Sequence, residues 1–154
     1  MKPTATLLAL AALISPAAAK PLPVYILSGQ SNMQGHAHVR TLDVMALDPR
    51  TAPLLKKMRD RDGAPTVCKD IYISSIGSSD NERSGQLTAG YGADQNGSKI
   101  GPEFSFGITL QEHLDGPALI IKTAWGGKSI HTDFRPPSAG PYEFRPDQIE
   151  KFQA

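Results

Sequence analysis

Three short, mostly apolar runs constrain the fold of this chain more than any other feature. They are Val24–Leu27, Asp70–Ser74 and Ala118–Lys122. Helices are predicted between them, over Thr51–Arg61 and Pro102–Leu114, because a proline lies at or near the start of each stretch and turn residues follow it. Strands that alternate with helices predict an α/β fold with a mostly parallel central sheet.

The first apolar run is continuous, which predicts a buried strand that ends at Ser28 and Gly29. In open α/β sheets, ligands bind at the carboxyl ends of the strands. The segment Ser75–Ile100 is rich in glycine, serine and asparagine, and it is long for a connection inside a compact domain. We therefore expect this segment to form a wall or a lid over that edge of the sheet.

Length and charge limit the partners that such a chain can have. Its 154 residues suit one domain, and 16 Lys and Arg against 15 Asp and Glu give a formal net charge of +1. Proteins that bind nucleic acid usually carry a basic patch, so no nucleic-acid partner is predicted. The single cysteine, Cys68, excludes an intramolecular disulfide and is interpreted as a small buried thiol.

Residues 1–19 have the features of a secretory signal peptide. Lys2 precedes the apolar run Leu7–Ile14, and small residues lead to a cleavage site after Ala19. The run is shorter than the roughly 20 residues that cross a bilayer, so no membrane anchor is expected after cleavage. We predict that residues 20–154 are secreted or periplasmic.

The chemistry is expected to begin where the first strand ends. Ser31 follows that strand directly, and Gly29 allows the backbone to turn tightly there. A helix that starts near Ser31 would present unpaired backbone N–H groups, which can stabilise negative charge on a reacting carbonyl oxygen. This arrangement is typical of acyl transfer. The alternative is that Ser31 only caps the helix.

Gly-Gln-Ser-Asn-Met at residues 29–33 resembles the nucleophile block of the sialate O-acetylesterase-like and carbohydrate esterase family 6 enzymes, which belong to the SGNH hydrolase superfamily. Two further blocks, Ile100–Gly107 and Ile121–Ile130, follow in the order that this family has them. The resemblance covers Val24–Ile130. It implies a three-layer α/β/α, flavodoxin-like domain that removes acetyl groups from carbohydrates.

The resemblance also implies roles for individual residues. Ser31 matches the nucleophile, and its own N–H would be one oxyanion donor. The turn that follows the third strand matches the block whose glycine N–H supplies a second donor. Gly126 is the favoured donor and Gly127 the alternative, although a plain strand-to-loop turn would have the same sequence. Activated serine and these donors suffice for ester hydrolysis, so no cofactor is predicted.

Three further residues are expected to bind the substrate: Gln30, Asn32 and Trp125. Trp125 would stack on a sugar ring, or it would pack in the core instead. The proline-rich stretch 136–146 is expected to form part of the substrate rim. Glu103 lies at the start of the second predicted helix, where a carboxylate is favoured, and is interpreted as structural.

The chain departs from the family pattern at the catalytic base. In the family, the base and its orienting acid come from a late Asp-x-x-His block, and a Gln-Gly-Glu block precedes it. Neither block is found in this sequence. It contains no Gln-Gly-Glu, and no aspartate lies three residues before any of its four histidines, which are His36, His38, His113 and His131. We interpret residues 20–154 as the amino-terminal part of a longer SGNH-type esterase domain. A sheet without its last strands would leave an edge strand and an apolar face uncovered.

If the base lay within this chain, His131, two residues before Asp133, would be the first candidate and His36 the second. His36 and His38 could also begin a zinc site, but no third ligand has a recognisable spacing, so no metal is predicted. The sequence thus predicts a secreted serine esterase that acts on acetylated carbohydrates and lacks its base here. The alternative is a non-catalytic carbohydrate-binding or structural relative.

Overall fold

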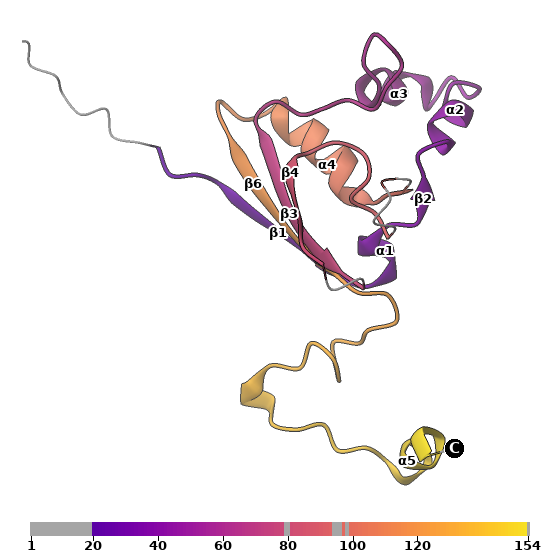
Figure 1. The fold of residues 1–154 in the computed structure, drawn as a ribbon, viewed down its shortest axis with the longest axis vertical. Coiled ribbons are helices and arrows are strands. Elements are labelled where there is room, and N and C mark those ends of the chain that lie inside the picture. The colour runs from indigo at the N-terminus through magenta and orange to yellow at the C-terminus, as the bar shows by residue number, and fades with distance from the viewer. Residues whose placement is uncertain (1–19, 79–80, 94–96, 98, 154) are drawn as a thin grey trace, which may run out of the picture.

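A computed structural model describes residues 20–78, 81–93, 97 and 99–153, so the predicted signal peptide lies outside the described residues. The described part is mixed α/β, with a four-stranded, mostly parallel sheet flanked by helices, as the resemblance implies (Figure 1). The strands lie in the order β1 (Val24–Gly29), β6 (Ala118–Ala124), β3 (Ile71–Gly77) and β4 (Arg83–Gln86). The first three are parallel, and β4 pairs antiparallel with β3.

Helices lie between these strands and after the last of them. The elements are α1 (Ser31–Gln34), α2 (Thr41–Met45), α3 (Ala52–Met58), α4 (Pro102–Gln111), a short 3₁₀ turn (Pro137–Ala139) and α5 (Pro146–Gln153). Two short strands, β2 (Ala37–His38) and β5 (Lys99–Ile100), form a separate antiparallel pair. The two predicted helices are confirmed as α3 and α4, each a few residues shorter than expected.

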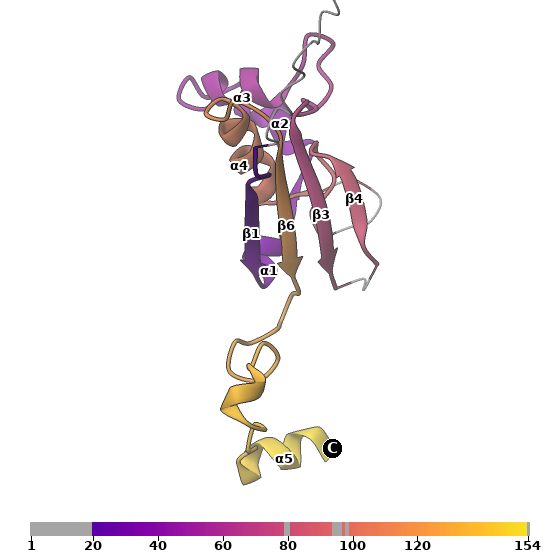
Figure 2. The same cartoon turned by 90° about the vertical axis from the view of Figure 1, so that its left-hand side faces the viewer.

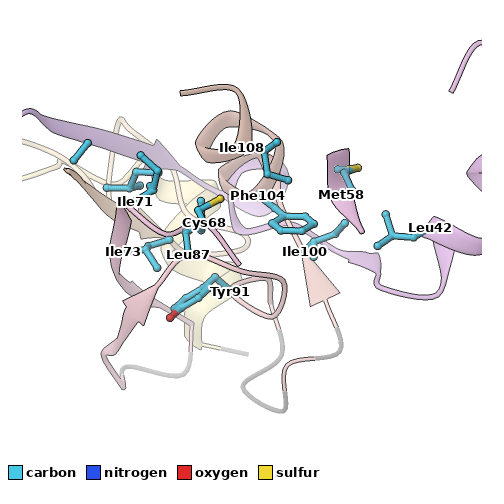
Figure 3. Close-up of a cluster of buried hydrophobic side chains, with 12 residues drawn as sticks. Leu42, Met58, Cys68, Ile71, Ile73, Leu87, Tyr91, Ile100, Phe104 and Ile108 are labelled. Atoms are coloured by element: carbon cyan, nitrogen blue, oxygen red, sulfur yellow. The ribbon is translucent and has the colours of Figure 1, made fainter. Parts of the chain in front are cut away.

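The hydrophobic core lies between the sheet and α4. Figure 1 shows α1 to α4 on one side of the sheet, and Figure 3 shows the buried side chains that fill the space between. Alternate residues of β3 and β6 point into this core, together with Phe104 and Ile108 of α4. Cys68 is buried there as predicted, and burial raises the pKa of its thiol to about 11.

On the opposite face of the sheet, the described side chains are exposed or partly exposed. Val24 and Ile26 of β1 are 50% and 70% exposed, and Tyr72 of β3 is 45% exposed. The prediction of a fully buried first strand is therefore wrong. β1 is the edge strand of the sheet, and its alternating side chains meet the core on one face only. One edge strand and one partly apolar face are thus uncovered among these residues.

The described residues of segment 75–100, called the wall segment below, extend the sheet and contact the end of helix α1. The segment continues β3, turns back as β4, and later forms β5. Its backbone also contacts the Ser31 helix, where Ala93 N–H donates to Gly35 O. The sequence Arg83–Gln86 has no apolar alternation, so its strand depends on pairing with β3 and was not visible as a strand.

The chain leaves the domain after β6. Figure 2 shows the segment that follows β6 running beyond the carboxyl ends of the strands and ending in α5. The stretch 136–146, expected to line the substrate rim, belongs to this segment. Among the residues that the structure describes, no helix has the length and apolar character needed to cross a bilayer.

Candidate active site

Two turns leave the sheet at the same edge. β1 and β6 are parallel neighbours, and Gly29 is paired with Ala124 at their carboxyl ends. Just beyond this pair, Trp125 N–H donates to Gly29 O at 3.3 Å. Neighbouring strands lie about 4.8 Å apart, so the Ser31 turn and the glycine turn start side by side.

Ser31 is the first residue of α1, and its side chain does not cap the helix. Gln30 occupies the cap position without a side-chain cap bond. The Ser31 hydroxyl, which is partly exposed, donates instead to Gln30 Oε1 at 3.2 Å. The capping alternative is therefore not what the structure shows. A residue at this first position has a backbone N–H without a partner inside its helix.

A buried ion pair between Lys122 and Glu103 holds the carboxyl end of helix α1. Lys122 of β6 is 1% exposed, and its Nζ donates to Glu103 Oε2 at 2.6 Å, Tyr91 O at 2.8 Å and Gln34 O at 2.9 Å. Burial lowers the pKa of the Lys122 ammonium, and the Glu103 carboxylate opposes this effect. All three ammonium hydrogens have acceptors, so the end of α1 is tied to both α4 and the wall segment.

Glu103 also completes the start of α4. Its Oε1 accepts from Gly101 N–H at 2.9 Å, and its side chain is fully buried. This arrangement fits the structural role that the sequence predicts for Glu103. Sequence reasoning missed Lys122, although a lysine inside a run such as Ala-Leu-Ile-Ile-Lys signals a buried charge that needs a partner.

A glycine contact brings α1 against the start of α4. Gly35 has φ +84°, and a Cβ built on it would lie 2.1 Å from Gly101 Cα. Neither the backbone conformation nor the space admits a side chain there. Helix α1 is therefore seated directly on the backbone that begins α4.

Ser78, which the sequence did not single out, contacts both turns. Its Oγ accepts from Gln34 Nε2 at 2.9 Å and from Gly126 N–H at 3.1 Å. The N–H of the favoured oxyanion donor, Gly126, is thus engaged with a hydroxyl. Gly127 has φ +74°, and its N–H has no hydrogen-bond partner among the described residues.

The two turns line a common pocket at the sheet edge. It brings together Gln30 and Gly127, whose substrate-binding and oxyanion roles stay predictions. The lining residues are Ser28, Gly29, Gln30, Gly127, Lys128, Ser129, Ile130, His131 and Phe134. Ser31 and Asn32 do not line this pocket. Asn32 is exposed at the surface, and its substrate-binding role stays a prediction.

Trp125 is partly buried and packs on Phe134. Their ring centroids are 5.8 Å apart at an interplanar angle of 58°. Together with Lys128 and Asp133, the two rings line a second pocket. Trp125 is therefore neither a core residue nor a fully exposed platform, and stacking on a sugar stays a prediction.

The acidic neighbour of His131 does not orient it. The Asp133 carboxylate accepts from Ser129 N–H, from Thr132 Oγ1 and from Lys128 Nζ, at 2.8 to 3.0 Å. These bonds lower the pKa of Asp133 to about 2. The His131 ring instead meets Tyr142 edge-on, with centroids 5.0 Å apart.

The histidines nearest Ser31 in sequence, His36 and His38, form no hydrogen bond with a carboxylate among the described residues. His36 is exposed, and His38 Nδ1 accepts from Arg40 N–H at 3.4 Å. Within residues 20–78, 81–93, 97 and 99–153, no three His, Cys, Asp or Glu side chains gather to hold a metal ion. No described histidine contacts Ser31 Oγ, whose bond runs to Gln30.

Comparison with known proteins supports the sequence resemblance. Residues 21–153 match the family model described as a carbohydrate esterase, sialic acid-specific acetylesterase. Searches of curated proteins and of solved structures found no match. The match extends over nearly all of the described chain, from the strand before Ser31 to α5. The chain therefore belongs to the sialic acid-specific acetylesterase family of carbohydrate esterases.

Proposed function

We propose that this chain carries the nucleophile and oxyanion donors of a secreted or periplasmic serine esterase, which removes O-acetyl groups from carbohydrates. The observation that carries the proposal is the placement of Ser31. It starts α1 at the sheet edge where the Gly126–Gly127 turn also begins, one strand away. Membership of the carbohydrate esterase family supports the acetylated-sugar substrate.

The reaction follows from this placement. Ser31 Oγ forms a bond to the acetyl carbon while its proton passes to a base, and the carbonyl oxygen becomes an oxyanion. The Ser31 N–H and one N–H of the glycine pair stabilise that charge. The carbon–oxygen bond to the sugar then breaks, and the sugar oxygen takes up the proton. Water releases acetate from Ser31 in a second, equivalent step.

The base of this reaction is proposed to lie outside the described residues. His131 contacts Tyr142, and the carboxylate nearest it in sequence is bound to its own loop. Residues 1–19 are proposed as a signal peptide, and an Asp-x-x-His block beyond this chain as the source of the base. The alternative is a carbohydrate-binding relative that never hydrolyses its ligand.

Acetate release tests the proposal. The protein encoded by the whole open reading frame and the 154-residue chain are each given O-acetylated sialic acid and acetylated xylan. We expect the whole product to release acetate, and Ser31→Ala to lower kcat/KM by a factor of about 10⁴ or more. The matched control Ser84→Ala removes an exposed hydroxyl of β4 and should leave activity unchanged.

Two results would contradict the proposal. A Ser31→Ala protein as active as the wild type would exclude Ser31 as the nucleophile. A stop codon directly after Ala154, together with the absence of Ser31-dependent release, would favour the non-catalytic alternative. Retention of the chain on an acetylated-sugar column would then be the activity to measure.

A further inference from the structure

Ser78 is the one described side chain that hydrogen-bonds to both halves of the proposed site. Its Oγ accepts from the Gln34 side chain at the end of α1 and from Gly126 N–H in the glycine turn. The three residues come from segments 44 to 92 positions apart in the sequence. The sheet places only the first residues of the two turns side by side. The Ser78 hydroxyl links the turns beyond that point.

The Gln34 end of this bridge is fixed to the core. Gln34 is 7% exposed, and its carbonyl oxygen accepts from the buried Lys122 Nζ. Lys122 is in turn paired with Glu103 at the start of α4. This bond fixes the Gln34 backbone, and burial restricts its side chain, so the side chain loses little further freedom on binding Ser78.

At the other end of the bridge, Gly126 packs against Gln34 and does not line the pocket. A Cβ on Gly126 would lie 2.9 Å from Gln34 Oε1, so the residue at 126 faces the Gln34–Ser78 side. Gly127 differs, because its Cβ position is open space and its φ is +74°. Gly127, and not Gly126, lines the pocket that contains Gln30.

We propose that Ser78 is a positioning residue that binds the Gly126 N–H and thereby leaves the Gly127 N–H as the donor directed at the reacting carbonyl. The role of Gly127 as a donor rests on the proposed esterase function. The positioning of the turn by Ser78 does not. A hydroxyl oxygen has two lone pairs, and in Ser78 both are used by Gln34 and Gly126. The bridge is thus complete without substrate.

Amide hydrogen exchange tests the positioning in the chain itself. In ¹⁵N-labelled protein, we expect Ser78→Ala to increase the exchange rate of the Gly126 amide by roughly fivefold, since one hydrogen bond contributes on the order of 1 kcal/mol. Ser78→Thr keeps the hydroxyl and should restore protection. Ser84→Ala, which removes an exposed β4 hydroxyl, is the matched control. Gly126 exchange that is unchanged in Ser78→Ala would overturn the inference.

Kinetics of the whole open-reading-frame product test the consequence for catalysis. Ser78→Ala should lower kcat by about tenfold with KM nearly unchanged, because a displaced donor affects the transition state more than the bound substrate. Ser78→Thr should recover most of kcat. A loss confined to KM would contradict the assignment of Gly127. If the wild type releases no acetate, the proposed function fails, while the exchange measurement still decides whether Ser78 positions the turn.

Discussion

The two halves of the proposed site are held in different ways. Helix α1 ends at a carbonyl bound by the buried Lys122, and Gly35 seats it on the start of α4. The loop after the glycine turn is held by the exposed Asp133, which binds its own neighbours in sequence. Helix α1, which carries the proposed nucleophile, is thus anchored to the core, whereas the proposed oxyanion side is a self-contained loop that joins the core through β6 and Ser78.

The largest effect should come from breaking the anchored half. Lys122→Met would leave the Glu103 carboxylate buried without its partner and remove a donor from two carbonyls. We expect the free energy of unfolding to fall by about 3–5 kcal/mol. Urea titration followed by circular dichroism measures this change.

A surface ion pair gives the matched control for that experiment. Lys57 and Glu112 pair at 2.8 Å, with side chains 50% and 43% exposed. Lys57→Met should therefore cost less than about 1 kcal/mol. The double variant Lys122→Met, Glu103→Gln should be more stable than Lys122→Met alone. If Lys122→Met and Lys57→Met proved equally mild, α1 would not depend on the buried pair.

Two glycine substitutions sharpen the comparison. Gly35 and Gly127 both have positive φ, but only Gly35 faces crowded backbone. Gly35→Ala should cost about 2–5 kcal/mol, from backbone strain together with overpacking. Gly127→Ala should cost about 1–2 kcal/mol, from strain alone. Thermal unfolding of the two variants checks the difference, and equal losses would show that α1 is not seated tightly on Gly101.

The smallest effect on stability is expected from Asp133. Its pKa is lowered to about 2, so its bonds contribute fully above the unfolded value of 3.8 and are lost as the pH falls through about 2. The Ser129 amide shift in an NMR titration should follow that midpoint. Asp133→Asn should lower the free energy of unfolding less than Gly127→Ala does, because the Asp133 carboxylate is exposed to solvent. A Ser129 midpoint at or above 3.8 would mean that the loop is not held by this carboxylate.

The sequence predicts the elements better than their arrangement. All three apolar runs are strands, and the helices at α3 and α4 are found where expected. Their order in the sheet, with β6 between β1 and β3, follows from long-range pairing that no local pattern contains. The exposure of Val24 and Ile26 has the same origin, because an apolar run does not reveal which of its faces the rest of the domain covers.

The candidate site was only partly visible in the sequence. The motif blocks predict that Ser31 and the glycine pair meet, since parallel strands end at one edge. Ser78 was not visible, because a serine at the end of a strand carries no local signal of two distant donors. The engagement of Gly126 by Ser78 could likewise not be read from Gly126-Gly127, whose two amides are equivalent until the tertiary contacts are known.

Because Gly29 pairs with Ala124, the number of residues in β6 determines where the glycine turn begins relative to the Ser31 turn. A strand advances about 3.3 Å per residue, and successive side chains alternate between its faces. One residue inserted in β6 before Lys122 would shift the glycine turn relative to Ser31. It would also move the Lys122 side chain to the solvent-facing side of the sheet. We therefore expect relatives to have no insertions or deletions between the Gly29–Ala124 pair and either turn, even where their loops vary in length.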